Sequence, residues 1–287
     1  MKRMLALLGV LLLLMLPGCA NTEATAQIAA TTLPVYEFTS RLCDGTDLTI
    51  TRLVTESVSC LHDYSLNVRQ VKAVEAAEVI VISGAGLEEF MEDILDGREI
   101  IDASAGIPLL ESADSHADGD DHEEDPHIWL SPANASGMAC NICAGLTERY
   151  PQYADTFSAN LEDLLAQLDA LQAYGEETLA ALSCRDLITF HDGFAYFAQA
   201  FGLNILEAIE EESGSEASAS ELKSLIQLVQ AYQLPAIFTE TNGSVSAAQV
   251  ICAETGAEAF TLDMAMASDS YFTSMYHNID TIKEALG

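Results

Sequence analysis

The chain has 287 residues, with 45 acidic against 11 basic side chains and a formal net charge of −34. Such an acidic surface repels a phosphate backbone, which excludes nucleic-acid binding as a main activity. It attracts cations at long range. The length is sufficient for one large or two modest domains.

Residues 1–18 have the pattern of a lipoprotein signal peptide. Lys2 and Arg3 precede an apolar run over residues 5–16, and Leu16-Pro17-Gly18-Cys19 is similar to the signal for lipid attachment to a cysteine. The apolar run is shorter than the ~20 residues that a membrane-spanning helix needs. We therefore expect an exported chain, anchored to the cell membrane through Cys19 on its extracytoplasmic face, with residues 19–26 as a tether.

From residue 27 onward, short apolar runs alternate with helical patterns. The sequence predicts strands over 27–31, 48–54 and 79–82, a further strand from Ile100, and helices over 34–43, from a cap at Ser65, and over 87–95. The segment Gly84-Ala85-Gly86 lacks the third glycine of a dinucleotide fingerprint, so it is interpreted as a tight turn.

An acidic run over residues 114–125 is interpreted as too polar to bury. After it, Ser131 and Pro132 predict the start of a helix, as N-cap and first helical residue. Cys140 and Cys143 lie inside this helix with no second pair nearby, so we expect two small buried apolar residues rather than a redox or zinc motif. A second helix over 152–182 would span ~45 Å, which is long enough to join two lobes.

The alternation then resumes. Strands are expected over 187–190, 203–209, 236–239 and 260–262, and helices over 193–201, from the Ser218 capping box to 232, over 245–255 and over 271–286. An acidic run over 207–216 is interpreted as a solvated loop. Two such blocks predict an α/β protein with two parallel-sheet lobes, over 27–150 and 183–287, joined by one long helix over 151–182.

Four polar side chains follow predicted strands or the turn before the first long helix: His62, His127, His191 and Asp263. Ligands collect at the carboxyl ends of the strands in open α/β sheets. Three imidazoles and a carboxylate suit Zn²⁺, whereas Ca²⁺ and Mg²⁺ prefer oxygen donors. Each residue also has a structural interpretation: a turn contact for His62, a surface position for His127, a core position for His191 and a cap for Asp263. Spacing alone leaves both interpretations open.

Several short segments carry a family resemblance. They are Cys60-Leu61-His62-Asp63-Tyr64, Gly84-Ala85-Gly86-Leu87-Glu88, Asp102-Ala103-Ser104, Asp125-Pro126-His127-Ile128-Trp129-Leu130, Thr189-Phe190-His191-Asp192-Gly193-Phe194 and Asp269-Ser270-Tyr271. In their order and coverage they resemble the solute-binding lipoproteins of zinc and manganese ABC importers. The resemblance implies a metal site in the cleft between the lobes, with His62, His127, His191 and Asp263 as ligands, a membrane permease as partner and a monomeric chain.

The chain departs from this family in one place and matches it in another. The usual proline-glycine segment is replaced by residues 56–60, which puts Cys60 near the site and leaves open a thiolate ligand or a disulfide, for example with Cys43. Residues 116–122 resemble the mobile His- and acid-rich loop of the family. His116 and His122 are too few to hold a metal alone, so a weak metal-collecting role and a solvated, disordered loop are both open.

The donor set favours zinc, because manganese importers of this family tend to carry Glu where this chain has His191, and nitrogen donors suit zinc. Manganese stays open because the fourth donor is Asp263. The main prediction is capture of the metal without chemistry. The rivals are a zinc-dependent hydrolase with Asp192 or Glu240 as base, which no H-E-x-x-H motif supports, and a surface adhesin with a structural metal.

Overall fold

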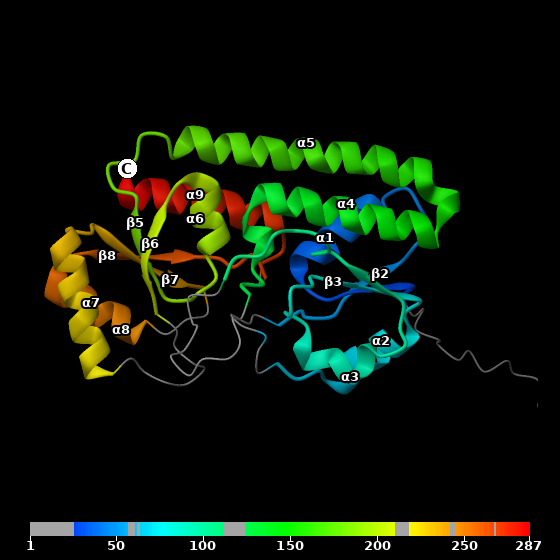
Figure 1. Cartoon of the computed structure of the whole chain (residues 1–287), viewed down its shortest axis with the longest axis horizontal. Helices are drawn as coiled ribbons and strands as arrows, with labels where there is room; N and C mark the ends of the chain where they lie inside the picture. Colours follow the sequence, from blue (N-terminus) through cyan, green and yellow to red (C-terminus); the bar gives the residue numbers. More distant parts are fainter. Residues whose placement is uncertain are drawn as a thin grey trace, which may run out of the picture.

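The structure is a computed structural model that describes residues 26–56, 61, 64–111, 124–209, 218–241, 245–266 and 268–287. It consists of two α/β lobes side by side beneath one long helix (Figure 1). The predicted residues Cys19, Cys60, His62, His116 and His122 lie outside the described residues.

The first lobe contains a four-stranded parallel sheet in the order β2-β1-β3-β4. Its strands are β1 Ile28–Ala30, β2 Ile50–Arg52, β3 Val79–Ile82 and β4 Ile100–Asp102. Ile28 of the central strand pairs with Ile50 on one side and Val79 on the other. The central strands β1 and β3 are continuous apolar runs because both faces of a parallel sheet are covered. The helices of this lobe are α1 Leu33–Leu42, α2 Val68–Ala76 and α3 Glu92–Leu95, the last preceded by the 3-10 turn η1 Glu89–Met91.

The second lobe repeats the plan with the order β6-β5-β7-β8, again fully parallel. Its strands are β5 Asp186–Thr189, β6 Asn204–Ala208, β7 Ala236–Glu240 and β8 Glu258–Leu262. Its helices are α6 Ala195–Phe201, α7 Ala219–Tyr232, α8 Ser246–Thr255 and α9 Tyr271–Leu286. The register of β5 against β6 shifts between Leu187 and Ile188.

The lobes are connected by the 3-10 turn η2 Ile128–Leu130, then α4 Pro132–Arg149, the short turn η3 Pro151–Tyr153 and α5 Ala154–Thr178. At 25 residues, α5 is ~38 Å long and runs across both lobes (Figure 1). It packs on α1 and α4 over the first lobe and on α9 over the second. Phe38, Leu168 and Ile282 therefore belong to one continuous apolar core, which the two lobes share.

The predicted α/β class with two parallel sheets is confirmed, and local differences have local causes. The helix predicted from Ser65 begins at Val68, because Asn67 caps it and Gln70 completes the capping box. The helix predicted over 87–95 is a 3-10 turn followed by a single α-helical turn. Cys143 is buried as predicted, but Cys140 is exposed on the outer side of α4, so that part of the prediction is wrong.

Within the described ranges, no helix combines the length and the apolar character that crossing a bilayer requires.

Candidate metal centre

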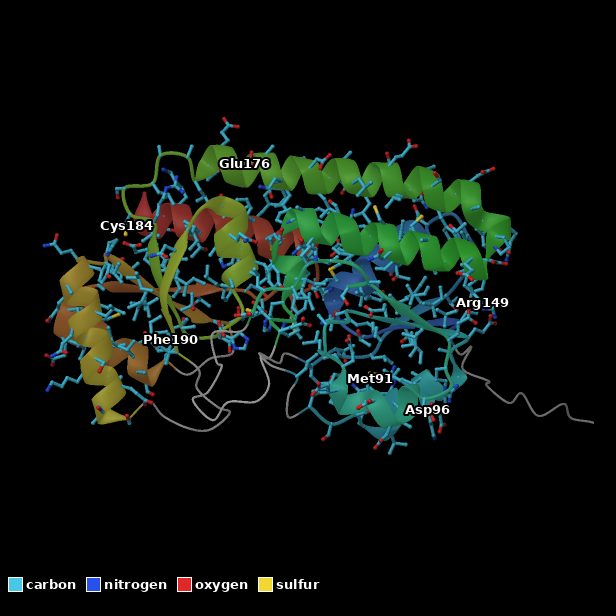
Figure 2. The ribbon with its side chains drawn as sticks, in the orientation of Figure 1. Met91, Asp96, Arg149, Glu176, Cys184 and Phe190 are labelled. Atoms are coloured by element: carbon cyan, nitrogen blue, oxygen red, sulfur yellow. The ribbon has the colours of Figure 1, made fainter. Side chains whose placement is uncertain are left out.

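His127 and His191 lie where the chain leaves regular structure beside the second sheet. His191 comes two residues after the end of β5, and His127 directly precedes η2. Cys184 and Phe190 mark the two ends of the β5 segment in Figure 2, and the Phe190 end points away from α5. This is the carboxyl edge of the sheet, where the loops of an open α/β lobe bind ligands.

The two imidazoles face each other with their Nε2 atoms 3.4 Å apart. Their ring planes are nearly perpendicular, at 85°, and both residues are buried, at 4% and 8% exposure. Two nitrogens that each lie ~2.1 Å from a tetrahedral zinc ion are themselves about 3.4 Å apart. The pair therefore fits two corners of one tetrahedral site.

Asp125 holds the His127 ring from behind. Its Oδ1 atom lies 2.8 Å from His127 Nδ1 and accepts a hydrogen bond of 2.9 Å from the His127 backbone N–H. A carboxylate on the remote nitrogen of a ligand histidine fixes the tautomer and leaves the other nitrogen as the metal donor. Here that other nitrogen is Nε2, the atom that faces His191.

The prediction that the acidic run over residues 114–125 is too polar to bury is wrong for Asp125. Asp125 is only 3% exposed, because the adjacent proline and the two bonds to His127 turn its side chain inward. The signal in the sequence is an acid two residues before a histidine with proline between them.

Trp129 and Gly193 shape the walls around the pair. The Trp129 ring meets His127 edge-on at 5.3 Å, and its indole N–H donates to the Met264 carbonyl at 2.8 Å. A Cβ atom at Gly193 would lie 2.6 Å from Met264 Cε, 2.8 Å from His191 Cδ2 and 3.0 Å from His127 Nδ1. Any larger residue at this position would therefore have to displace Met264 and the two rings.

Asp263 directly follows β8, as predicted, and it is half-buried. Its Oδ1 accepts from Ala265 N at 2.7 Å and its Oδ2 from Ser274 Oγ at 2.8 Å. Asn278 holds its backbone on both sides, at 2.8 and 2.7 Å. The carboxylate thus bonds within its own lobe.

The structure brings His127 and His191 together and gives Asp263 a separate set of partners. Among the residues that the structure describes, no three His, Cys, Asp or Glu side chains converge on one metal position. Asp263 and His62, which lies outside the described residues, stay predictions as ligands.

Cys43 is a free, buried thiol at the C-terminal end of α1. Burial raises its pKa to about 12, so the thiol is protonated at neutral pH. Cys60 lies outside the described residues, so the disulfide considered between Cys43 and Cys60 stays a prediction.

Comparison with known proteins gives one consistent family. The family model for the periplasmic component A of the zinc-uptake complex, ZnuA, matches residues 28–285. The zinc-binding lipoprotein AdcA of Streptococcus pneumoniae serotype 4 is 27% identical over 307 residues, covering 99% of this chain and 61% of its own length. The zinc-binding protein AdcA of Streptococcus pyogenes serotype M1 is 26% identical, covering 91% and 56%. The chain thus spans less than two thirds of these relatives.

Solved structures match over most of the chain. A crystal structure of ZnuA is 31% identical, with a TM-score of 0.79, and the match covers 91% of this chain and 100% of that one. The solute-binding protein FpvC of Pseudomonas aeruginosa in complex with Mn²⁺ is 25% identical, with a TM-score of 0.80 over 91% and 98%. The same protein has been solved with Ni²⁺.

Proposed function

Because the chain belongs to the family of ZnuA, the periplasmic component A of zinc-uptake complexes, we propose that it captures zinc outside the cytoplasm and delivers it to an ABC permease. The observation that carries this proposal is the buried His127–His191 pair, with Nε2 atoms 3.4 Å apart and Asp125 behind one ring. This spacing matches two ligands of a tetrahedral ion.

The types of ligand atom favour zinc over manganese. Imidazole nitrogen suits zinc, whereas carboxylate and carbonyl oxygens suit manganese. In our proposal, His62 and Asp263 complete the site with one more nitrogen and one oxygen. A manganese-binding protein of the same importer class is the alternative, since a carboxylate is the fourth donor and FpvC has been solved with Mn²⁺.

The proposed cycle involves binding and release without a catalytic step. The net charge of −34 raises the local concentration of cations around the cleft. Ligation requires neutral imidazoles and an ionised carboxylate, so protons compete with zinc and binding weakens from pH 7.5 to pH 5. Cys19 would anchor the monomeric chain to the membrane beside its permease, and His116 and His122 would collect ions weakly.

The deciding experiment is elemental analysis after exposure of the purified protein to equimolar zinc and manganese. We expect one zinc per chain and little manganese, loss of zinc in His191→Gln, and retention in His277→Gln, which removes an exposed histidine from α9. Preferential uptake of manganese would overturn the choice of metal. Absence of both metals from the wild-type protein would overturn the importer function.

A further inference from the structure

The segment that carries His127 is fastened to the second lobe, although it precedes the linking helix in the chain. Three hydrogen bonds cross to it from that lobe. Tyr196 Oη donates to the Asp125 carbonyl at 2.9 Å, and Tyr271 Oη donates to the Trp129 carbonyl at 2.8 Å. The third runs from the Trp129 indole to the Met264 carbonyl.

Tyr196 is the member of this set nearest to the histidine pair in the chain. It lies in the first turn of α6, five residues after His191, and is only 1% exposed. Its hydroxyl also accepts from Leu110 N at 2.9 Å, so the oxygen both donates and accepts. Burial raises the pKa of Tyr196 to about 12, so the hydroxyl keeps the proton that it donates to Asp125.

Asp125 connects Tyr196 to the His127 ring. Its carbonyl accepts from Tyr196, its backbone N–H donates to the Leu110 carbonyl at 2.8 Å, and its carboxylate holds the His127 ring. The peptide units on both sides of Asp125 are therefore anchored. The side chain can keep only a narrow range of directions, and the imidazole that it holds is limited in the same way.

We propose that Tyr196 is a positioning residue of the zinc site: its hydroxyl fastens the Asp125–His127 unit to the helix that follows His191, which keeps the two imidazoles at ligand spacing before the ion arrives. This inference rests on the proposed function. A site that is already arranged loses less conformational freedom when it binds an ion. Partners in the outer shell of a metal site typically change affinity by ~10–100-fold when they are removed.

The test compares four proteins: wild type, Tyr196→Phe, Asp125→Asn and the double variant. Asp125→Asn leaves the carbonyl that Tyr196 bonds and removes the negative charge behind the His127 ring, so each single variant weakens a different link of the same chain of contacts. Zinc affinity is measured by competition with a chromogenic chelator. We expect each single variant to bind zinc at least about tenfold more weakly than wild type. The double variant should bind no more weakly than the single variant with the larger loss, because the tyrosine acts through the aspartate.

Tyr150→Phe is the matched control. Tyr150 is a buried tyrosine at the end of α4, and its hydroxyl bonds Glu78 at 3.4 Å in the first lobe. Thermal unfolding in chelator gives the stability of each apoprotein. A purely structural hydroxyl would lower the unfolding temperature in both Tyr→Phe variants and leave zinc affinity unchanged in both.

Cobalt gives a second readout, because the intensity of its visible bands reports the coordination geometry. We expect Tyr196→Phe to alter the Co²⁺ spectrum and Tyr150→Phe to reproduce that of the wild type. A Tyr196→Phe protein with wild-type zinc affinity and cobalt spectrum would overturn the inference, and so would losses that add in the double variant. If the wild-type protein itself bound no zinc, the proposed function would fail instead.

Discussion

Glu88 is predicted to make the unfolding free energy of this chain fall as the pH rises. The residue is 5% exposed at the carboxyl edge of the first sheet. Its Oε1 accepts from Thr31 Oγ1 at 2.6 Å and Ser83 N at 2.7 Å, and its Oε2 accepts from Gly84 N at 3.0 Å. Burial raises the pKa from 4.5 to about 7 although these hydrogen bonds act in the opposite direction.

The sign follows from the two protonation equilibria. Below pH 4.5 the Glu88 carboxyl is protonated in both the folded and the unfolded chain, and its contribution to the unfolding free energy is fully present. Between pH 4.5 and about 7 the unfolded chain releases the proton while the folded chain keeps it, so the unfolding free energy falls. Above that range both states are ionised and the fall ends. The difference between the two pKa values corresponds to a total fall of about 3 kcal/mol in the unfolding free energy.

The assay is urea unfolding of the metal-free protein at several pH values from 4.5 to 8.5. Trp129 is the single tryptophan of the chain and is fully buried, so its fluorescence reports the transition. Glu88→Gln removes the ionisation. Glu92→Gln, at an exposed position four residues later, removes one charge from the surface as the control.

Glu88→Gln should lower stability by ~1–3 kcal/mol at acidic pH, because the new amide group faces the Gly84 N–H. Between pH 4.5 and 8.5, its unfolding free energy should fall by about 3 kcal/mol less than that of wild type or of Glu92→Gln. Parallel profiles for wild type and Glu88→Gln would refute the assignment of this pH dependence to Glu88.

Three further predictions concern the site and the cysteines. Gly193→Ala should weaken zinc binding by at least about tenfold in a competition titration, because its Cβ would push both imidazoles; wild-type affinity would contradict this. Asp263→Asn keeps an oxygen for the Ala265 N–H but loses the anionic donor, so calorimetry should show a similar loss, and an unchanged affinity would argue against ligation. In the folded protein, mass spectrometry should find Cys140 alkylated long before Cys43, whose thiol is buried; equal rates would contradict the packing of α1.

Much of the fold could be predicted because local patterns and tertiary packing agree. The apolar run at Val79–Ile82 forms a central strand, and Ser218 with Glu221 forms the expected capping box at the start of α7. Where two possible N-cap residues lie within three positions of each other, the local sequence pattern does not show which one begins the helix. Ser65 and Asn67 both have capping side chains, and the choice falls to Asn67 because Gln70 completes the reciprocal bond.

The strand-end positions of His191 and Asp263 were predictable, because parallel strands bring their carboxyl ends to one edge. The burial of Asp125 was not, because a run of acidic residues indicates solvation for every member unless a partner is known. The contacts of Trp129 and Tyr196 depend on residues 135 and 71 positions away in the chain, which no local pattern contains.

The predicted lobe boundaries place His127 in the first lobe. Its segment hydrogen-bonds to Tyr196, Met264 and Tyr271 of the second lobe, which also carries His191, and to Leu110 of the first lobe. Contacts from both lobes therefore hold this segment, and the apolar core under α5 joins the two lobes. The two imidazoles are thus held with their Nε2 atoms 3.4 Å apart, and we expect capture of the ion to begin on this pair.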